Sequence, residues 1–215
     1  STRDGCAAYY ILKGDGTSFN PYQIKECSDL EIISNKLDAN YKIMNDIDCS
    51  DTKNWNNRKG FDPIGVNGKP FTGILDGEGH KIIGLYINRP NVDFVGLFGI
   101  VAGSDAKKAE IKNLILENPL IIGKNDVGGI VGSATKTDIL RVSVIDTSHR
   151  YFRAIEDWIG IENPNSEIRT VGKGIIGRDY VGGIAGEIML GDVSESFSEI
   201  LMSGNSRVGG LIGSY

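Results

Sequence analysis

A short glycine-rich motif recurs along the chain and constrains its fold more than any other feature. It reads Val-Gly-Gly-Ile-Val-Gly at 127–132, returns with small changes at 181–186 and 208–213, and has the variant Phe-Val-Gly-Leu-Phe-Gly at 94–99. Corresponding glycines in the four copies are Gly96, Gly129, Gly183 and Gly210, so the intervals are 33, 54 and 27. Because 54 is twice 27, the intervals predict a repeating unit of about 27 residues, within the range of solenoid proteins.

Segments of alternating apolar and polar residues lie between the copies, at 111–116, 139–145 and 193–200. Apolar residues at every second position put one face of a β-strand toward a core. The repeat therefore predicts a β-solenoid of short strands and tight turns. Its glycines are predicted to be structural, either because the backbone needs a positive φ or because it lies close to the neighbouring coil. The residues with this predicted role are Gly96, Gly99, Gly128, Gly129, Gly132, Gly182, Gly183, Gly186, Gly209, Gly210 and Gly213.

The motif resembles that of the GLUG-motif family, whose Gly-Leu-any-Gly signature matches residues 96–99. The segments at 61–65 and 70–87 are similar to the entry module that precedes the repeats in this family, and those at 21–24, 29–30 and 41–48 to its capping coils. The resemblance covers roughly residues 19–213, apart from one insertion. It implies a right-handed parallel β-helix of the pectate-lyase shape, in a family that includes bacterial adhesins and accessory regions of IgA-specific metallopeptidases. Such a resemblance implies fold better than activity.

We therefore expect one elongated all-β domain over residues 1–215. Its predicted parts are an N-terminal cap and first coils at 1–60, with a short helix at 29–37, an entry module at 61–93, and GLUG repeats at 94–215 with an insertion at about 146–171. A solenoid grows by adding coils, so this length does not require a second domain. Because the chain begins abruptly and stops directly after a repeat, we expect a fragment of a longer protein, monomeric by itself, whose parent has further repeats.

Three cysteines, Cys6, Cys27 and Cys49, lie in the first quarter of the chain. The segments at 22–24 and 41–43 are predicted to be equivalent strands of successive coils, and Cys27 and Cys49 come after them. Neighbouring strands lie about 4.8 Å apart, and a disulfide needs Cα atoms within about 7 Å. We therefore predict a bridge between Cys27 and Cys49, with buried free thiols as the alternative. A bridge would imply an oxidising compartment, the periplasm or the cell surface.

Charge and hydropathy exclude several classes of partner. The net charge is −5 and the isoelectric point is near 5.1, and no stripe of Lys and Arg is present, which argues against nucleic acid or an anionic membrane surface. No apolar run is long enough to span a bilayer. Together with the family resemblance, these features favour an extracellular or cell-surface location in a bacterium.

No motif specifies a catalytic, cofactor or metal site. Neither His80 nor His149 belongs to a His-Glu-x-x-His zinc motif, and His80 lies in a predicted hairpin-like turn at 76–80. The Gly-x-Gly-x-x-Gly pattern at 172–177 is followed by a repeat strand, not by the helix that a dinucleotide site needs. Asp46, Asp48 and Asp51 form a loose acidic cluster without EF-hand spacing. We expect no cofactor and no enzyme, with a polysaccharide lyase or glycosidase as the alternative.

The insertion at about 146–171 is rich in aromatic residues and breaks the repeat. Tyr151, Phe152 and Trp158 are predicted to bind a partner, because exposed Tyr and Trp anchor many interfaces. The alternative is a degenerate extra coil whose aromatic residues fill the core. The sequence thus predicts a non-catalytic adhesive stalk that presents loops to a host or cell-surface protein or glycan. The accessory region of a large surface protease is a further alternative.

Overall fold

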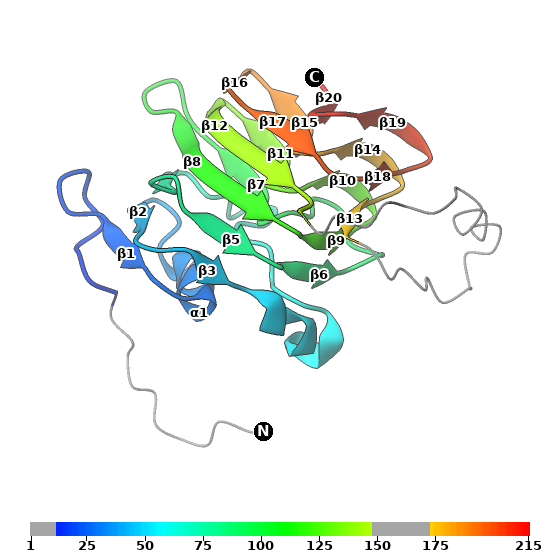
Figure 1. Cartoon of the computed structure of the whole chain (residues 1–215). Helices are drawn as coiled ribbons and strands as arrows, with labels where there is room; N and C mark the ends of the chain where they lie inside the picture. Colours follow the sequence, from blue (N-terminus) through cyan, green and yellow to red (C-terminus); the bar gives the residue numbers. More distant parts are fainter. Residues whose placement is uncertain (1–11, 148–172) are drawn as a thin grey trace.

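A computed structural model describes residues 12–147 and 173–215 as a stack of short parallel β-strands (Figure 1). The strands of these residues form four sheets. The long sheet contains β1 (Tyr22–Ile24), β2 (Asn40–Ile43), β3 (Ile47–Asp48), β4 (Ile74–Asp76), β5 (Lys81–Ile83), β8 (Ala109–Glu117), β12 (Thr137–Ile145), β16 (Asp192–Ser194) and β17 (Phe197–Glu199). The second sheet contains β6 (Tyr86–Asn88), β9 (Leu120–Ile122), β13 (Gly174–Ile176) and β18 (Met202–Ser203).

Two further sheets and a few short helices complete the described elements. The third sheet contains β10 (Asn125–Gly128), β14 (Asp179–Gly182) and β19 (Ser206–Gly209). The fourth sheet contains β7 (Phe98–Ala102), β11 (Val131–Thr135), β15 (Ala185–Met189) and β20 (Ile212–Ser214). The helices are α1 (Cys27–Ile32) and the 3-10 helices η1 (Ile33–Asn35), η2 (Ser50–Asn54) and η3 (Asn56–Arg58). None of the helices in the described ranges has the length and apolarity that a membrane crossing requires.

The chain visits the sheets in a fixed order. After β8 in the long sheet it passes through β9, β10 and β11 in the other three, and it returns to the long sheet as β12, directly beside β8. The next turn passes through β13, β14 and β15 in the same order and returns as β16 and β17 beside β12. The strands are parallel because each turn of the chain runs in the same direction as the previous one. Strand pairing therefore joins successive turns along the whole stack.

The register between turns shows what the repeat intervals mean. Val127 pairs with Val181, and Val181 pairs with Val208. The interval of 54 residues and the interval of 27 residues therefore each separate two adjacent layers. The longer interval is therefore one layer and not two stacked units. The link between β8 and β9 is residues 118–119, but the equivalent link between β12 and β13 is residues 146–173. The additional length of this turn falls in the link that contains the predicted insertion.

Alternation in the sequence appears as burial on one side of each strand. Ile111 in β8 pairs with Ile139 in β12, and both side chains are fully buried. The first layers also bury aromatic residues whose rings are in contact, with ring centroids 6.3 Å apart for Tyr41 and Phe71 and 4.8 Å apart for Phe71 and Phe98. Burying one Val, Leu, Ile or Phe side chain contributes about 1.5–3 kcal/mol. Apolar residues from successive turns, in strand register or in ring contact, thus supply the core.

The predicted helix is present, but its predicted bounds of 29–37 are wrong. It begins earlier because Asp29 and Glu26 form a capping box: Asp29 Oδ2 accepts hydrogen bonds from the backbone N–H groups of Lys25 and Glu26 at 2.7 and 3.1 Å. The α-helix continues as the tighter 3-10 helix η1. This 3-10 helix ends at Asn35, because the next residue lies outside the helical φ/ψ region. The capping box satisfies backbone donors at the start of α1.

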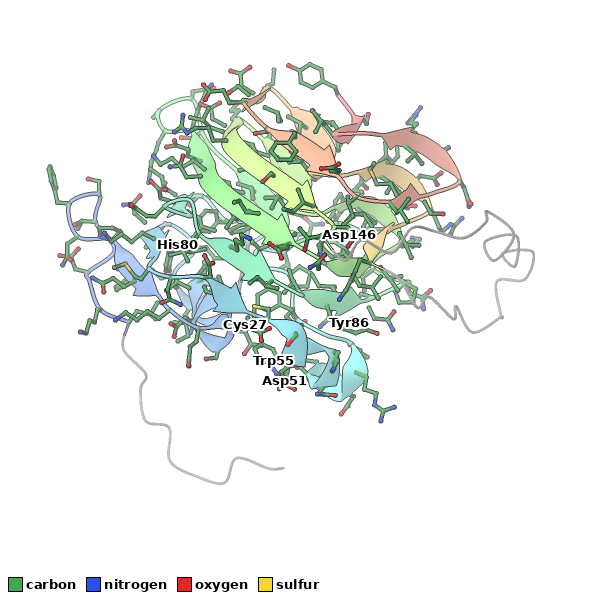
Figure 2. The ribbon with its side chains drawn as sticks, in the orientation of Figure 1. Cys27, Asp51, Trp55, His80, Tyr86 and Asp146 are labelled. Carbon is green, nitrogen blue, oxygen red and sulfur yellow. A yellow bond between two sulfur atoms is a disulfide. The ribbon has the colours of Figure 1, made fainter. Side chains whose placement is uncertain are left out.

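Cys27 and Cys49 form a disulfide, with Cα atoms 5.3 Å apart (Figure 2). The strand register used to predict this pair is confirmed, since Tyr22 in β1 pairs with Tyr41 in β2. Cys27 is the first residue of α1 and Cys49 follows β3, so the bond joins the helix to the next turn of the chain. Cys6 lies outside the described residues.

Left-handed backbone occurs at non-glycine residues, where the sequence interpretation did not place it. Asp126, Tyr180 and Arg207 have φ angles of 54°, 55° and 52° at equivalent positions of three successive turns. The motif glycines do not have a positive φ. Gly128 and Gly132, for example, lie in β10 and β11, where strand pairing requires extended backbone. Of the two predicted reasons for the motif glycines, positive φ therefore does not apply.

Close contact between layers is the remaining reason for glycine. A Cβ on Gly129 would lie 2.5 Å from the carbonyl oxygen of Gly183 in the next turn and 2.9 Å from the Val144 side chain. A Cβ on Gly183 would lie 2.6 Å from the carbonyl oxygen of Gly210. At Gly210, in the last described turn, a Cβ would have no such atom within 4 Å. The need for glycine at this position thus depends on the layer stacked on it.

Removing the disulfide should destabilise the N-terminal layers. Because the bond joins cysteines separated by 22 positions, the variant Cys27→Ser/Cys49→Ser should lose about 3 kcal/mol of unfolding free energy. Denaturant titration measures the loss, and Cys6→Ser is the control because it removes a thiol but leaves the bond. Mass spectrometry of a non-reduced digest should recover the linked peptides. Equal midpoints for the double variant and the parent would contradict the role assigned to the bond.

Adding one methyl group at Gly129 should be costly, whereas the same change at Gly210 should not. Gly129→Ala drives its Cβ against the carbonyl oxygen of Gly183, and we expect a loss on the order of 2 kcal/mol or more. Gly210→Ala should cost less than about 1 kcal/mol, because the space around that Cβ is open. Thermal and urea unfolding of the two variants measures the difference. Similar losses for both would show that glycine is needed there for a reason other than layer contact.

Candidate functional site

A groove of about 540 Å³ lies on the outer face of the long sheet. Ligand pockets in proteins commonly have volumes of about 300–1,000 Å³, so the groove is large enough for part of a ligand. Its residues come from β8, β12 and β17 and from the links beside these strands, so the groove crosses several layers. The lining residues are Glu78, Gly79, Asn113, Ile115, Arg141, Val142, Ser143, Glu195 and Phe197.

A bend in the long sheet forms one side of the groove. Asn113 in β8 and Arg141 in β12 have φ angles of 52° and 53° in mid-strand, and Glu195, between β16 and β17, has 49°. The strand register places Arg141 opposite Asn113. Left-handed backbone in an otherwise extended strand changes its direction, and stacking repeats the change in each layer. The result is a column of polar side chains along the stack.

The loop at 77–80 closes one end of the groove. The sequence predicted a hairpin-like turn at 76–80, and this is wrong because β4 and β5 both run parallel to β8. Asp76 pairs with Lys112 and Lys81 pairs with Ile115, so residues 77–80 lie opposite only residues 113 and 114. The loop bulges from a continuous sheet and does not reverse the chain.

Polar contacts across the layers hold the column in place. The Arg141 Nε atom donates a hydrogen bond to Asn113 Oδ1 at 2.7 Å, and Asn113 Nδ2 donates to Asp76 Oδ1 at 2.8 Å. An Arg141 Nη1 atom lies 3.8 Å from a Glu195 carboxylate oxygen. The Lys112 ammonium group, in turn, pairs with Glu110 at 3.1 Å. The guanidinium group of Arg141 is therefore oriented by neighbours from both adjacent layers.

An apolar wall faces this column. Ile115 and Phe197 contribute to it, and Phe197 is 55% exposed. Phe197 pairs in register with Ser143, which is 6% exposed although it lies on the outer face of β12. The groove thus combines one open aromatic ring with hydrogen-bonding groups.

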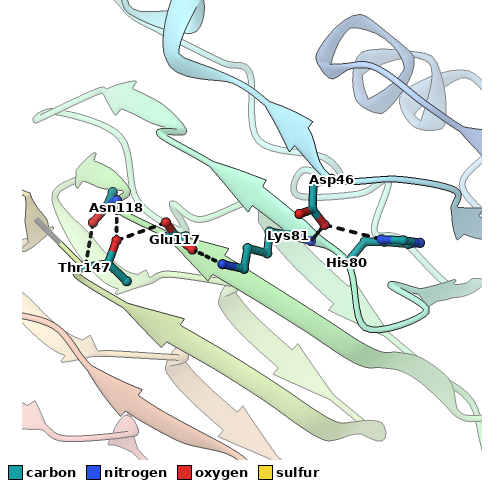
Figure 3. A network of polar contacts seen from close by, with 6 residues as sticks. All are labelled: Asp46, His80, Lys81, Glu117, Asn118 and Thr147. Atoms are coloured by element: carbon teal, nitrogen blue, oxygen red, sulfur yellow. Dashed lines mark hydrogen bonds and ion pairs between the residues drawn. The ribbon is translucent and has the colours of Figure 1, made fainter.

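A second polar network runs from the loop at 77–80 to the C-terminal ends of β8 and β12 (Figure 3). Asp46 Oδ1 lies 3.3 Å from His80 Nδ1 and accepts a hydrogen bond from the Lys81 backbone N–H at 3.0 Å. The Lys81 Nζ atom donates to Glu117 Oε2 at 2.7 Å, and the Thr147 hydroxyl donates to Glu117 Oε1 at 3.0 Å. Four layers of the long sheet are thereby linked, from the start of β3 to the end of β12.

The charges of Asp46, Lys81 and Glu117 in this network are stable at neutral pH. The hydrogen bond from the Lys81 backbone lowers the pKa of Asp46 below its ordinary value. The hydrogen bond between Lys81 and Glu117 raises the pKa of the lysine and lowers that of the glutamate. His80 is held by Asp46, and its backbone N–H donates to the Gly77 carbonyl at 2.8 Å. This arrangement gives the network a structural cross-linking role.

The loose acidic cluster near Asp46 separates into turn contacts. Asp48 Oδ1 accepts a hydrogen bond from the Ser50 backbone N–H at 2.8 Å, and Asp51 Oδ1 accepts one from Asn54 Nδ2 at 2.7 Å. Across residues 12–147 and 173–215, no three His, Cys, Asp or Glu side chains are grouped so that they could hold a metal ion.

Asp126, half-buried in the third sheet, lies among carboxylates. Burial, together with the charges of Glu187, Asp93 and Asp179, raises the pKa of Asp126 to about 6. Two of its neighbours have partners, since Asp93 pairs with a lysine ammonium group at 3.2 Å and Asp179 accepts a hydrogen bond from a serine hydroxyl. The ionised form of Asp126 is therefore unfavourable in the folded protein.

The sequence did not identify the groove. The predicted partner-binding residues Tyr151, Phe152 and Trp158 lie outside the described residues, so the structure does not locate them. The sequence did contain one indication of the groove. Polar residues recur at one position of the repeat, namely Asn113, Arg141 and Glu195. Polar residues at one repeat position predict a column, but they do not predict the bend.

Comparison with known proteins supports the fold and gives partial relatives. No family model matches the sequence. Halomucin from Haloquadratum walsbyi is 38% identical over 142 residues, which are 62% of this chain and 2% of halomucin. A "Putative Gly-rich membrane protein" of Evansella cellulosilytica is 33% identical over 110 residues, which are 50% of this chain and 12% of that protein. The chain therefore spans only a small part of each relative.

One solved structure has a similar fold. The crystal structure of a "putative immunoglobulin A1 protease" from Bacteroides ovatus superposes with a TM-score of 0.54 and 15% identity, over 94% of this chain and 63% of that one. At this identity the match concerns the fold alone. The described arrangement, in which successive turns add parallel strands to each sheet, therefore occurs in a solved protein.

The raised pKa of Asp126 predicts a pH-dependent stability. Because its folded pKa of about 6 exceeds its ordinary value, protonation favours the folded state, and this contribution is lost as pH rises through 6. Asp126→Asn should therefore raise the unfolding free energy at pH 7.5 by on the order of 1 kcal/mol, a value reduced for partial exposure. Asparagine also tolerates the left-handed backbone.

At about pH 3, below the ordinary pKa of 3.8, the parent and Asp126→Asn should have nearly equal stability. Urea unfolding at both pH values makes the comparison. An equal or lower stability of the variant at pH 7.5 would show that the neighbouring carboxylates do not penalise this charge.

Proposed function

We propose that the chain is part of a right-handed parallel β-helix of the GLUG-motif type, and that it serves as a non-catalytic adhesive module of a bacterial surface protein. The observation that carries the proposal is the register of successive turns, in which each sheet pairs with its counterpart in the next turn. Such a stack can be extended along one axis by adding turns, and it forms a stiff spacer. A spacer of this kind presents loops away from a surface.

The relatives support a surface location. One is described as a membrane protein and another as halomucin, and this chain covers only a small part of each. The disulfide adds a physical argument, because such bonds persist in oxidising compartments and are rare in the cytosol. We therefore place the module outside the cytoplasm, at the cell surface or in the extracellular space.

We propose a host or cell-surface protein or glycan as the partner. Two surfaces are candidates: the insertion that carries Tyr151, Phe152 and Trp158, and the groove on the long sheet. The acidic composition, with a net charge of −5, disfavours nucleic acid and anionic membranes. No cofactor is required by this function.

A carbohydrate-active enzyme is the second candidate, and one observation favours it. Glu78, Glu195 and Arg141 line the same groove, and glycosidases use paired carboxylates. Glu195, however, is paired with Arg141, at 3.8 Å, so one of the two carboxylates that a glycosidase would need already has a partner. An accessory region of a large surface protease is also compatible with the fold match. We therefore prefer a binding role.

Binding without turnover is the expected outcome for the purified chain. On an array of glycans and host matrix proteins the chain should bind at least one class of probe, and Tyr151→Ala/Phe152→Ala/Trp158→Ala should reduce that signal if the insertion contributes. Incubation with pectin, alginate and host glycans should release no reducing ends and no unsaturated products. Product release that Glu78→Gln or Glu195→Gln abolishes would instead establish an enzyme.

A further inference from the structure

We propose that the groove on the long sheet binds a neutral polysaccharide chain, with the ring of Phe197 as its stacking surface. The inference rests on the proposed binding function and specifies the ligand class of one of its two surfaces. It is carried by the composition of the groove, its charge and its direction across the layers.

Phe197 is placed to stack on a ligand. Within β17, Ser198 points toward the core, where its hydroxyl lies beside Gly183, so Phe197 points outward. Its ring is 55% exposed, and its register partner Ser143 is nearly covered. An aromatic ring that is open to solvent inside a groove offers a flat apolar surface. The C–H face of a sugar ring is a flat apolar group of matching shape.

The opposite wall suits hydroxyl groups. Arg141 and Asn113 supply N–H donors and an amide oxygen, Glu78 and Glu195 supply carboxylate oxygens, and the Arg141–Asn113 contact of 2.7 Å fixes two of these groups in advance. A hydroxyl group both donates and accepts hydrogen bonds. A ligand with many hydroxyls can therefore satisfy donors and acceptors that alternate along one wall.

Charge selects a neutral ligand over an acidic one. Arg141 is the one cationic residue of the lining, and Glu195 lies 3.8 Å from its guanidinium group. Glu78 adds a further negative charge to the same groove. Uronic acids, sulfated sugars and phosphates would meet net negative charge here, which disfavours their approach.

Strand pairing disfavours a peptide that binds by adding a strand. The floor of the groove is made largely by β8 and β12, and β12 pairs with β8 on one side and with β16 and β17 on the other. A peptide bound by strand addition needs a free sheet edge, and among the described strands of the groove that edge lies at β17, at one end of the groove and not along its floor. The groove also crosses the strands, so it runs along the stack.

The direction of the groove suits a polymer. Asn113, Arg141 and Glu195 occupy one position in three successive layers of the long sheet. Layers lie about 4.8 Å apart, so polar groups recur at a regular distance along the groove. A linear chain with a regular repeat can contact several of them at once.

The test is affinity electrophoresis of the folded chain in native gels that contain dextran, laminarin or galactomannan, with alginate as the acidic probe and gels without polymer as reference. The gels are run at an ionic strength of about 0.15 M, where surface charges are screened. The chain should be retarded by at least one neutral polymer and not by alginate. Phe197→Ala should weaken the binding about ten-fold or more, as loss of a central aromatic contact does. Phe197→Tyr should retain it.

Leu190→Ala is the matched control, because Leu190, between β15 and β16, is also an exposed apolar residue but does not line the groove. Its binding should equal that of the parent, and the melting temperatures of all three variants should stay close together. Retardation by alginate alone, no retardation by any neutral polymer, or unchanged binding of Phe197→Ala would each overturn the proposal.

The results of this test and of the array experiment together show which of the two proposals fails. If the chain binds a host protein on the array but no neutral polysaccharide, the adhesive function stands and the groove assignment falls. If a neutral polymer is bound and then cleaved, the groove assignment stands and the non-catalytic function falls. If neither assay gives binding, both proposals fail.

Discussion

Parallel pairing between successive turns is the interaction on which the structure depends, because no single turn can bury its own apolar residues. Val127, Val181 and Val208 occupy one position in three neighbouring layers. Val127 and Val181 are fully buried, whereas Val208 pairs with one described neighbour and is 44% exposed. The residue type is the same and only the number of covering layers differs. Stability in such a stack is therefore a property of the contacts between layers, and the requirement for glycine at Gly129 and Gly183 follows from the same contacts.

The parts of the fold that depend on spacing could be predicted from the sequence. Alternation located the strands of the long sheet, and the equivalence of the segments at 22–24 and 41–43 gave the register that brings Cys27 and Cys49 together. The left-handed residues could not be predicted in this way. That conformation costs a non-glycine residue such as Tyr180 or Arg141 about 1–2 kcal/mol, so local preference argues against it. Pairing with the layers on each side supplies the compensation, and no short stretch of sequence contains that information.

The same limit explains why the candidate site was missed. Alternation predicts that residues 139–145 form one straight strand, and β12 does cover them, but Arg141 bends it. A groove arises only because Asn113 and Glu195 make the same bend in the neighbouring layers, which requires knowledge of the pairing. The sequence did predict a second binding surface, the aromatic insertion, through its composition. Composition identifies residues that suit a partner, whereas the groove depends on geometry that several distant segments create together.

Stacking also determines what kind of site such a fold provides. In a globular domain a bend affects one loop, but here a bend in one turn is transmitted to the next by strand pairing and becomes a feature that runs along the stack. The polar contacts follow the same direction, since Arg141 contacts Asn113 in one neighbouring layer and Glu195 in the other. A site of this form presents similar groups at regular distances, and its affinity can grow with the number of layers that a ligand crosses. The repeat that stabilises the scaffold is thus also the reason that a linear polymer is the ligand best matched to it.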